Sequence, residues 1–384
     1  MSGTAFVVLP SQSKHGVIFG KNAARPDGDV MEVVFVPAGE SSGDIQCTYV
    51  SVEAAGPTKA VILNKSSWTW GAESGANESG IAIGTLAVSS KYSEGDADVT
   101  VPRLLGVDLV RLGLERASSA SEALDVITSL LEKYGQGGSS SDKSDVFHCN
   151  SFIIVDGSTC FVLDTCGKHW AVEEITSGSK CIANMYTIGT NITKHSEGLQ
   201  DFAKSNGLWN GEGDFNFAAA FNVSDQHKEE TYQNACKELT NAVAAGAFKE
   251  SNMFQLLRSE ELLANAKCPT MGAQVSTLSN TRPSAHWFTA TQDPRQSVFK
   301  PLMFTPNAVI SKHTVCPNKN EPHVLFSLHQ AAINKQDDVQ SLLRSMEQNC
   351  VEELDGVIDT LGDDLSEFDE LLKDCVETEV KFYR

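Results

Sequence analysis

The chain has 384 residues, of which 50 are Asp or Glu and 30 are Lys or Arg, so its formal net charge is −20 at pH 7. This length fits one large or two ordinary domains, and a hydrophobic content of 41% allows a sizeable core. The charge repels phosphates and anionic membrane surfaces, and no basic run offsets it, which argues against nucleic acid as a partner.

Apolar runs in the chain fall short of the roughly 18 residues that a membrane span needs, and the first ten residues lack the pattern of a signal peptide. We therefore expect a cytoplasmic protein without membrane insertion. The ten cysteines follow no repeating framework, which predicts buried free thiols in a reducing compartment.

The first part of the chain alternates short β-branched and aromatic runs with turn residues, which is typical of successive strands. The predicted strands cover residues 5–9, 16–19, 32–36, 47–52, 59–63 and 81–87. Apolar residues then recur at helical spacing over 101–114 and 123–134. A flexible connection over 135–142 is expected to lead to strands over 150–155 and 159–164. This order favours a layered α/β sandwich.

The C-terminal part has a different pattern. Residues 298–304 are predicted to form a last strand and 306–322 a loop, after which the chain becomes helical and acidic. We expect one large domain over residues 1–310, and over 311–384 a loop and acidic helices that pack on it. A dedicated partner-binding tail is the alternative interpretation of these helices.

The densest motif lies just before a predicted strand and contains Trp68, Trp70, Glu73, Asn77 and Glu78 among three glycines. Indoles offer large apolar faces, glycines allow close approach of the backbone, and carboxylates and amides offer directed hydrogen bonds. The motif therefore predicts a ligand site, with a buried turn that uses the tryptophans as core residues as the alternative.

Several familiar chemistries have no motif in this sequence. Gly-x-Gly-x-x-Gly after a strand, the Walker phosphate loop, Cys-x-x-Cys and His-Glu-x-x-His are all missing, and we expect neither a metal nor an organic cofactor. The nearest approach to a nucleophile or metal cluster is His148 with Cys149, together with Cys160 and Cys166. Because Cys149 and Cys160 lie at the edges of apolar strands, inert thiols are the favoured interpretation.

Six blocks of the chain carry a family resemblance: residues 68–78, 106–116, 130–138, 206–215, 297–301 and 374–382. These blocks resemble the secernins, and the resemblance covers nearly the whole length. Secernins are similar in turn to cysteine dipeptidases of the N-terminal nucleophile hydrolase superfamily. The resemblance implies an αββα sandwich that hydrolyses dipeptides or related amides. Secernins are also linked to regulated exocytosis, which would instead make the chain a non-catalytic adaptor or ligand-binding protein with partners in the secretory machinery.

In that superfamily an N-terminal cysteine attacks the amide carbonyl while its own α-amine, with a pKa of about 8, acts as general base. The resemblance places this cysteine at Gly3 or at Ala5, and neither residue is a nucleophile. Ser2, freed by removal of Met1, is chemically competent and is our candidate nucleophile. It lies one residue out of register, however, as does Thr4, and such a slip turns a side chain to the opposite face of a strand.

Other positions implied by the resemblance are partly altered. Ala24 stands where the family allows an acidic residue, and Thr85 and Leu86 stand where secernins have Asn and Glu. Asn184 is the candidate for stabilising an oxyanion. The predicted substrate-binding residues are Lys21, Asn22, Arg25, Trp68, Trp70, Glu73, Asn77 and Glu78. We expect a small peptide or amine as ligand; each residue has a structural role as its alternative, which is favoured for Asn77 because Asn readily adopts turn conformations.

Overall fold

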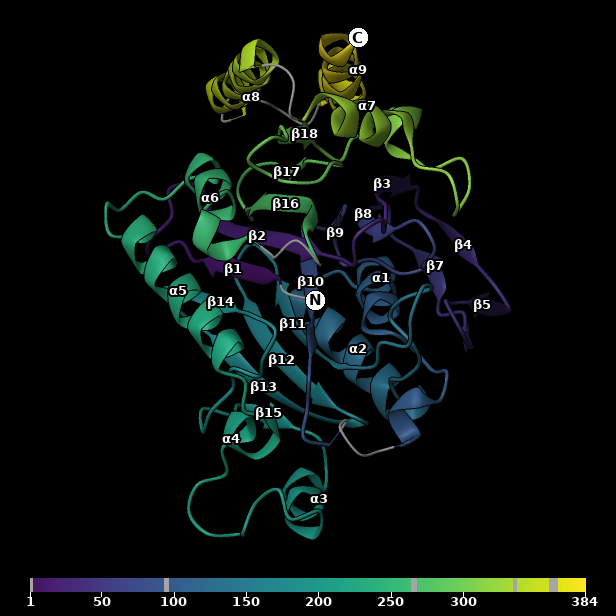
Figure 1. The fold of residues 1–384 in the computed structure, drawn as a ribbon, viewed down its shortest axis with the longest axis vertical. Helices are drawn as coiled ribbons and strands as arrows, with labels where there is room; N and C mark the ends of the chain where they lie inside the picture. The colour runs from purple at the N-terminus through teal and green to yellow at the C-terminus, as the bar shows by residue number, and fades with distance from the viewer. Residues whose placement is uncertain (1–2, 93–96, 264–267, 334–336, 359–364) are drawn as a thin grey trace.

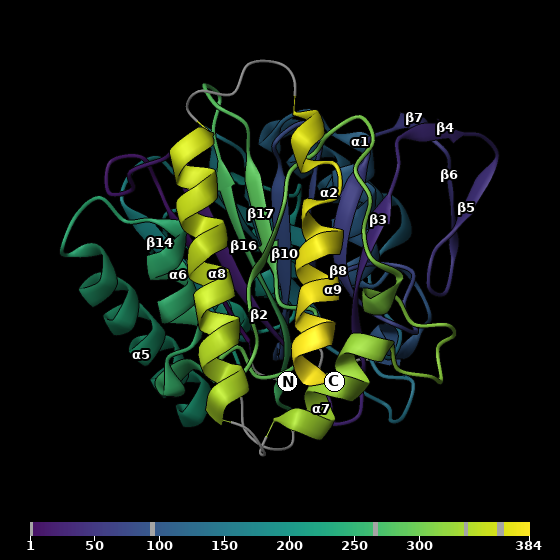
Figure 2. The ribbon, with the colours of Figure 1, turned by 90° about the horizontal axis from the view of Figure 1, so that it is seen from above.

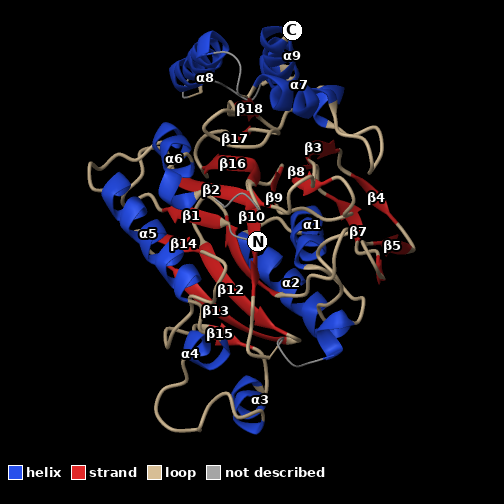
Figure 3. Cartoon of the chain, in the orientation of Figure 1, coloured by secondary structure: helices blue, strands red, loops and turns tan. Residues whose placement is uncertain are grey.

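Two antiparallel sheets form the centre of the computed structural model, which describes residues 3–92, 97–263, 268–333, 337–358 and 365–384 (Figures 1 and 3). The six-stranded sheet has the order β14 (Ser179–Ile182), β1 (Thr4–Val8), β2 (Val17–Ala24), β16 (Thr270–Leu278), β17 (Ala285–Phe288) and β18 (Lys300–Leu302). The eight-stranded sheet has the order β15 (Lys194–His195), β13 (His169–Ile175), β12 (Cys160–Cys166), β11 (Cys149–Val155), β10 (Ala82–Val88), β9 (Ser74–Asn77), β8 (Val61–Ser66) and β3 (Met31–Val36). Two small hairpin sheets pair β4 (Gly39–Ser41) with β7 (Gly56–Thr58) and β5 (Asp44–Gln46) with β6 (Ser51–Glu53).

Helices cover the outer face of each large sheet (Figure 1). α1 (Gly106–Arg116) and α2 (Ala120–Tyr134) pack on the eight-stranded sheet, whereas α5 (Gln226–Val243) and α6 (Glu250–Leu257) pack on the six-stranded sheet. The short helices α3 (Leu199–Ser205) and α4 (Phe217–Phe221) follow β15, and short 3₁₀ turns lie at Ala97–Thr100, Glu260–Leu262, Lys312–Thr314 and Ser366–Phe368.

Among the described residues, strand alternation places most buried apolar side chains in three large clusters. In β1, Ala5 and Val7 face the core between the two sheets, and Phe6 and Val8 face the core beneath α5 and α6. A third cluster lies between the eight-stranded sheet and α1 and α2. These layers form the αββα sandwich that the resemblance implies, and the fold prediction is confirmed.

The C-terminal helices lie against the β18 edge of the six-stranded sheet, and Figure 2 shows α8 and α9 side by side above it. They are α7 (Val324–Ala332), α8 (Asp337–Val357) and α9 (Leu371–Tyr383). Lys300 of β18 and Glu379 of α9 are both fully buried, with Nζ and Oε2 2.6 Å apart. The division of the chain at residue 310 remains a proposal.

Most predicted elements are present, with ends shifted by a few residues. The strand predicted over 47–52 is wrong, because residues 47–50 form the turn between β5 and β6, in which the Cys47 amide donates to the Val50 carbonyl over 2.9 Å. Within the described ranges, the helices are either too short or too polar to cross a membrane.

Candidate functional site

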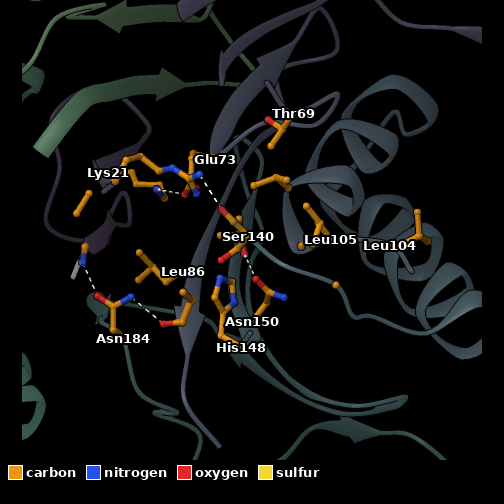
Figure 4. A pocket seen from close by; sticks show the side chains of 18 of the residues that line it. Lys21, Thr69, Glu73, Leu86, Leu104, Leu105, Ser140, His148, Asn150 and Asn184 are labelled. Atoms are coloured by element: carbon orange, nitrogen blue, oxygen red, sulfur yellow. Dashed lines mark hydrogen bonds and ion pairs between the residues drawn. The ribbon is translucent and has the colours of Figure 1, made fainter. Parts of the chain in front are cut away.

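A cleft opens where the two sheets, the first turn of α1 and the loop over residues 137–148 meet (Figure 4). Its cavity volume is about 30 Å³, and about 600 Å³ is reached only when all space between the atoms and the open solvent at its mouth are counted. Lys21, Glu73, Ser140, His148 and Asn184 point toward this space from four separate segments of the chain. The cleft is therefore assembled by tertiary packing. The sequence predicts a flexible connection over residues 135–142, and this segment forms part of one wall of the cleft.

Two buried cations share one carboxylate in the cleft. Lys21 extends from β2 across Gly84 of the opposite sheet, where a Cβ atom would lie 2.8 Å from the Lys21 side chain. Lys21 Nζ is 3.3 Å from Glu73 Oε2, and Arg25 Nη1 is 2.9 Å from Glu73 Oε1. Burial lowers the pKa of Lys21, against the opposing effect of Glu73. Burial alone would raise the pKa of Glu73, but Lys21 and Arg25 hold it below its ordinary value.

Arg25 is fixed by contacts on several sides. Its Nε donates to Asp29 Oδ2 over 2.8 Å, and its Nη2 donates to the Ser140 carbonyl over 2.9 Å. Asp29 in turn accepts a hydrogen bond from Ser66 Oγ. The guanidinium thus ties β2 to the cleft loop, while the Glu73 carboxylate stays 12% exposed toward the cleft.

The N-terminal strand enters the cleft at Gly3. Its backbone amide donates to Asn184 Oδ1, and Asn184 Nδ2 donates to the Ala87 carbonyl over 2.7 Å. A Cβ atom at Gly3 would lie 3.0 Å from both the Asn22 carbonyl oxygen and Leu86 Cδ2. Leu86 therefore occupies the space that a side chain at position 3 would enter.

The other candidate nucleophile positions lie elsewhere. Ala5 is fully buried in the core between the sheets. By strand alternation, Thr4 faces the opposite side, and its buried hydroxyl has no hydrogen-bond partner among the described residues. The candidate nucleophile Ser2 lies outside the residues that the structure describes.

His148 supplies a neutral imidazole to the cleft. Its Nδ1 lies 2.9 Å from the Cys149 carbonyl, which can only accept, so Nδ1 carries the proton and Nε2 is an acceptor. Burial lowers the pKa of His148 to about 4, so the ring is uncharged at neutral pH. Cys149 instead packs in the core between the sheets. Residues two apart in extended chain share a face, and His148 and Asn150 both line the cleft. This alternation is the sequence signal that could have identified His148.

The two tryptophans of the dense motif lie apart from the cleft, although Thr69 between them lines it. Trp68 lines a neighbouring cavity together with Met271. Trp70 packs beside the cluster under α1, with the Arg111 guanidinium 4.1 Å from its ring centre. The structure therefore does not form a single ligand pocket lined by both indoles.

Three further predicted binding residues have structural contacts. Asn77 Nδ2 donates to two backbone carbonyls at the end of α1, over 2.8 and 2.9 Å. Glu78 is exposed and accepts from the Ala60 amide over 3.0 Å. Asn22 Nδ2 donates to the Leu257 carbonyl in α6 over 2.8 Å. The structure thus brings together Lys21, Arg25, Glu73 and Asn184, but places Asn22, Trp68, Trp70, Asn77 and Glu78 elsewhere.

The hydroxyl side chains that line the cleft are engaged with the backbone. Thr69, Thr85 and Ser140 each donate to a carbonyl oxygen, over 3.2, 3.2 and 3.1 Å. Among the described residues, this cleft is lined by no cysteine, and no group of three or more His, Cys, Asp or Glu side chains is arranged to hold a metal ion. Lys21, Arg25, Glu73 and Asn184 offer charged and amide groups for binding in this cleft.

Comparison with known protein families gives a match over the segment that carries Glu73, His148 and Asn184. Residues 51–240 match the model of peptidase family C69. The matched segment supplies β10, β11 and α1 to the cleft, whereas Lys21 lies on β2 and Arg25 directly follows that strand.

Two solved structures show a more distant similarity to this chain. One is a variant of conjugated bile acid hydrolase from Clostridium perfringens, with 13% identity, a TM-score of 0.46, and coverage of 74% of this chain and 88% of that chain. The other is an N-acylethanolamine-hydrolyzing acid amidase ortholog from Caenorhabditis elegans, with 12% identity, a TM-score of 0.36, and coverage of 71% and 92%.

Proposed function

We propose that this protein binds small peptides or amines in the cleft and has little or no thiol-dependent amidohydrolase activity. The observation that carries the proposal is the contrast between two parts of one site. Lys21, Arg25 and Glu73 keep their buried charges, whereas Gly3 offers no side chain and Leu86 fills the space beside it.

The retained charges favour a ligand that carries both signs. The Glu73 carboxylate can accept hydrogen bonds from an ammonium group, and Lys21 can donate to a carbonyl or carboxylate oxygen. A dipeptide offers both groups, and its peptide carbonyl lies between them. The family C69 match supports a peptide-like ligand, and the lack of a thiol among the described residues that line the cleft supports retention without cleavage.

Residual hydrolysis, where present, is proposed to depend on Ser2 and its α-amine. Ser2→Ala removes the hydroxyl, and N-terminal acetylation removes the base. Both changes should abolish turnover to the same extent, because paired groups of this kind act as a unit. Unchanged turnover after either modification would reject this mechanism.

Equilibrium dialysis with labelled dipeptides tests the binding proposal. Ala24 lines the cleft, so Ala24→Leu should fill it without changing any charge and weaken dipeptide binding by at least about tenfold, or about 1.4 kcal/mol. Ala219→Leu is the matched control, because Ala219 is exposed on α4. Equal binding by Ala24→Leu and the wild type, with both proteins folded by circular dichroism, would place the ligand elsewhere.

A further inference from the structure

Two thiols from distant parts of the chain touch behind the six-stranded sheet. Cys181 lies in the edge strand β14 and Cys236 lies in α5, and their Sγ atoms are 2.9 Å apart. A disulfide bond is about 2.05 Å long, so a small side-chain adjustment would join them. Cys181 is only 2% exposed, whereas Cys236 is partly exposed to solvent. Of the pair, Cys236 is the one that a small solute can reach.

The surroundings favour a thiolate on Cys236. A hydrogen bond from the Cys181 thiol is the largest effect, and with the neighbouring Tyr232 and Lys180 it lowers the pKa of Cys236 to about 6. By contrast, burial raises the pKa of the Cys47 thiol to about 12. A partly exposed thiol of low pKa beside a second thiol is the arrangement found at oxidant-sensitive cysteines.

We propose that Cys181 and Cys236 form a peroxide-responsive pair that closes to an intramolecular disulfide. The Cys236 thiolate attacks one oxygen of hydrogen peroxide, the O–O bond breaks, and hydroxide leaves, which gives a sulfenic acid on Cys236. Cys181 then attacks the Cys236 sulfur, the S–O bond breaks, and the departing hydroxide takes the Cys181 proton as water. The two thiols lose two electrons, and the peroxide gains them.

The location of the pair connects it with the cleft. β14 pairs with β1 through Cys181 opposite Phe6, and the chain reaches Asn184 three residues after Cys181. α5 packs on both β14 and β1. A disulfide would therefore fasten α5 to the strand that leads to Asn184, and it would close a loop of 55 residues.

The test uses the full chain carrying Cys350→Ser and Cys375→Ser, since those two thiols form another contact at 3.6 Å. After treatment with hydrogen peroxide, non-reducing peptide mapping should find the Cys181 and Cys236 peptides linked, with a mass loss of 2 Da. The melting temperature should rise by roughly 2–5 °C and return to its starting value after dithiothreitol.

Two variants separate the roles of the thiols. Cys181→Ser should leave a sulfenic acid on Cys236 that dimedone labels, and Cys236→Ser should leave Cys181 unmodified at the same peroxide dose. The proposal is overturned if Cys236 proceeds to sulfinic acid while Cys181 stays free, or if neither thiol changes when the protein remains folded.

Discussion

The Leu86 side chain limits the space that a side chain at position 3 could occupy. Gly3→Cys should destabilise the protein by about 1–3 kcal/mol, because the added Cβ meets Leu86 Cδ2 and a backbone oxygen at 3.0 Å. Leu86→Ala should cost about 2–5 kcal/mol by itself. The double variant should lose less than the sum of the two by about 1 kcal/mol or more, as measured by urea unfolding. Additive losses would show that Leu86 does not obstruct this position.

Glu73 is the only carboxylate shared by both cleft cations in the described part of the chain. Glu73→Gln should destabilise the protein by about 3–5 kcal/mol, since it leaves Lys21 without its charged partner in a buried site. Glu53→Gln is the matched control, because Glu53 and its partner Lys133 are 75% and 53% exposed. The control should unfold at the same denaturant concentration as the wild type. Equal stabilities of all three proteins would contradict the assignment of a buried charge network.

A fully buried ion pair joins α9 to β18. Lys300 Nζ contacts Glu379 and donates to the Thr289 and Val298 carbonyls over 2.6 and 2.9 Å. Glu379→Gln should therefore cost about 3–5 kcal/mol. Lys300→Met combined with Glu379→Leu should recover most of this loss, because an apolar pair needs no charge compensation. Chemical unfolding of the two variants measures the difference, and a double variant less stable than Glu379→Gln would be the contrary result.

α7 is held by two neutral histidines. His323 Nδ1 accepts from the Phe326 amide at the start of α7 over 3.1 Å, and its Nε2 donates to the Met31 carbonyl over 3.0 Å. His329 lies between Tyr383 and the Gln292 carbonyl, each at 2.8 Å. Protonation of His323 would put a donor at Nδ1, where the Phe326 amide needs an acceptor. Burial lowers the pKa of each histidine to about 4.

The lowered pKa values of these two histidines make the free energy of unfolding depend on pH. An unfolded histidine has a pKa of about 6.5, so the unfolded chain binds more protons between about pH 6.5 and 4. The stabilisation is complete above that range and is lost as the pH falls, by up to about 1.4 kcal/mol per pH unit for each histidine. His329→Asn should flatten this slope, whereas the exposed His227→Asn should not. Identical slopes by urea unfolding for wild type and His329→Asn would refute the assignment.

At the scale of the whole molecule, the order of strands and helices, together with the family resemblance, predicts the sandwich. β16 was not predicted, although Met271, Ala273 and Val275 alternate along it; the residues between them include the polar side chains of Gln274 and Ser276, which are also buried. Glu73, Lys21 and Arg25 could be anticipated from their motifs. The separation of Trp68 from Trp70 could not, because it depends on how the turn around Thr69 packs against other segments.

One measurement tests the central claim most directly. The intact protein is incubated with a mixture of dipeptides, with and without prior iodoacetamide treatment, and the protein-bound and free fractions are separated by rapid gel filtration and analysed by mass spectrometry. The account predicts that intact dipeptides accompany the protein in both samples and that free amino acids do not accumulate. Release of amino acids that iodoacetamide abolishes would contradict it, because a thiol outside the described cleft lining would then be the nucleophile.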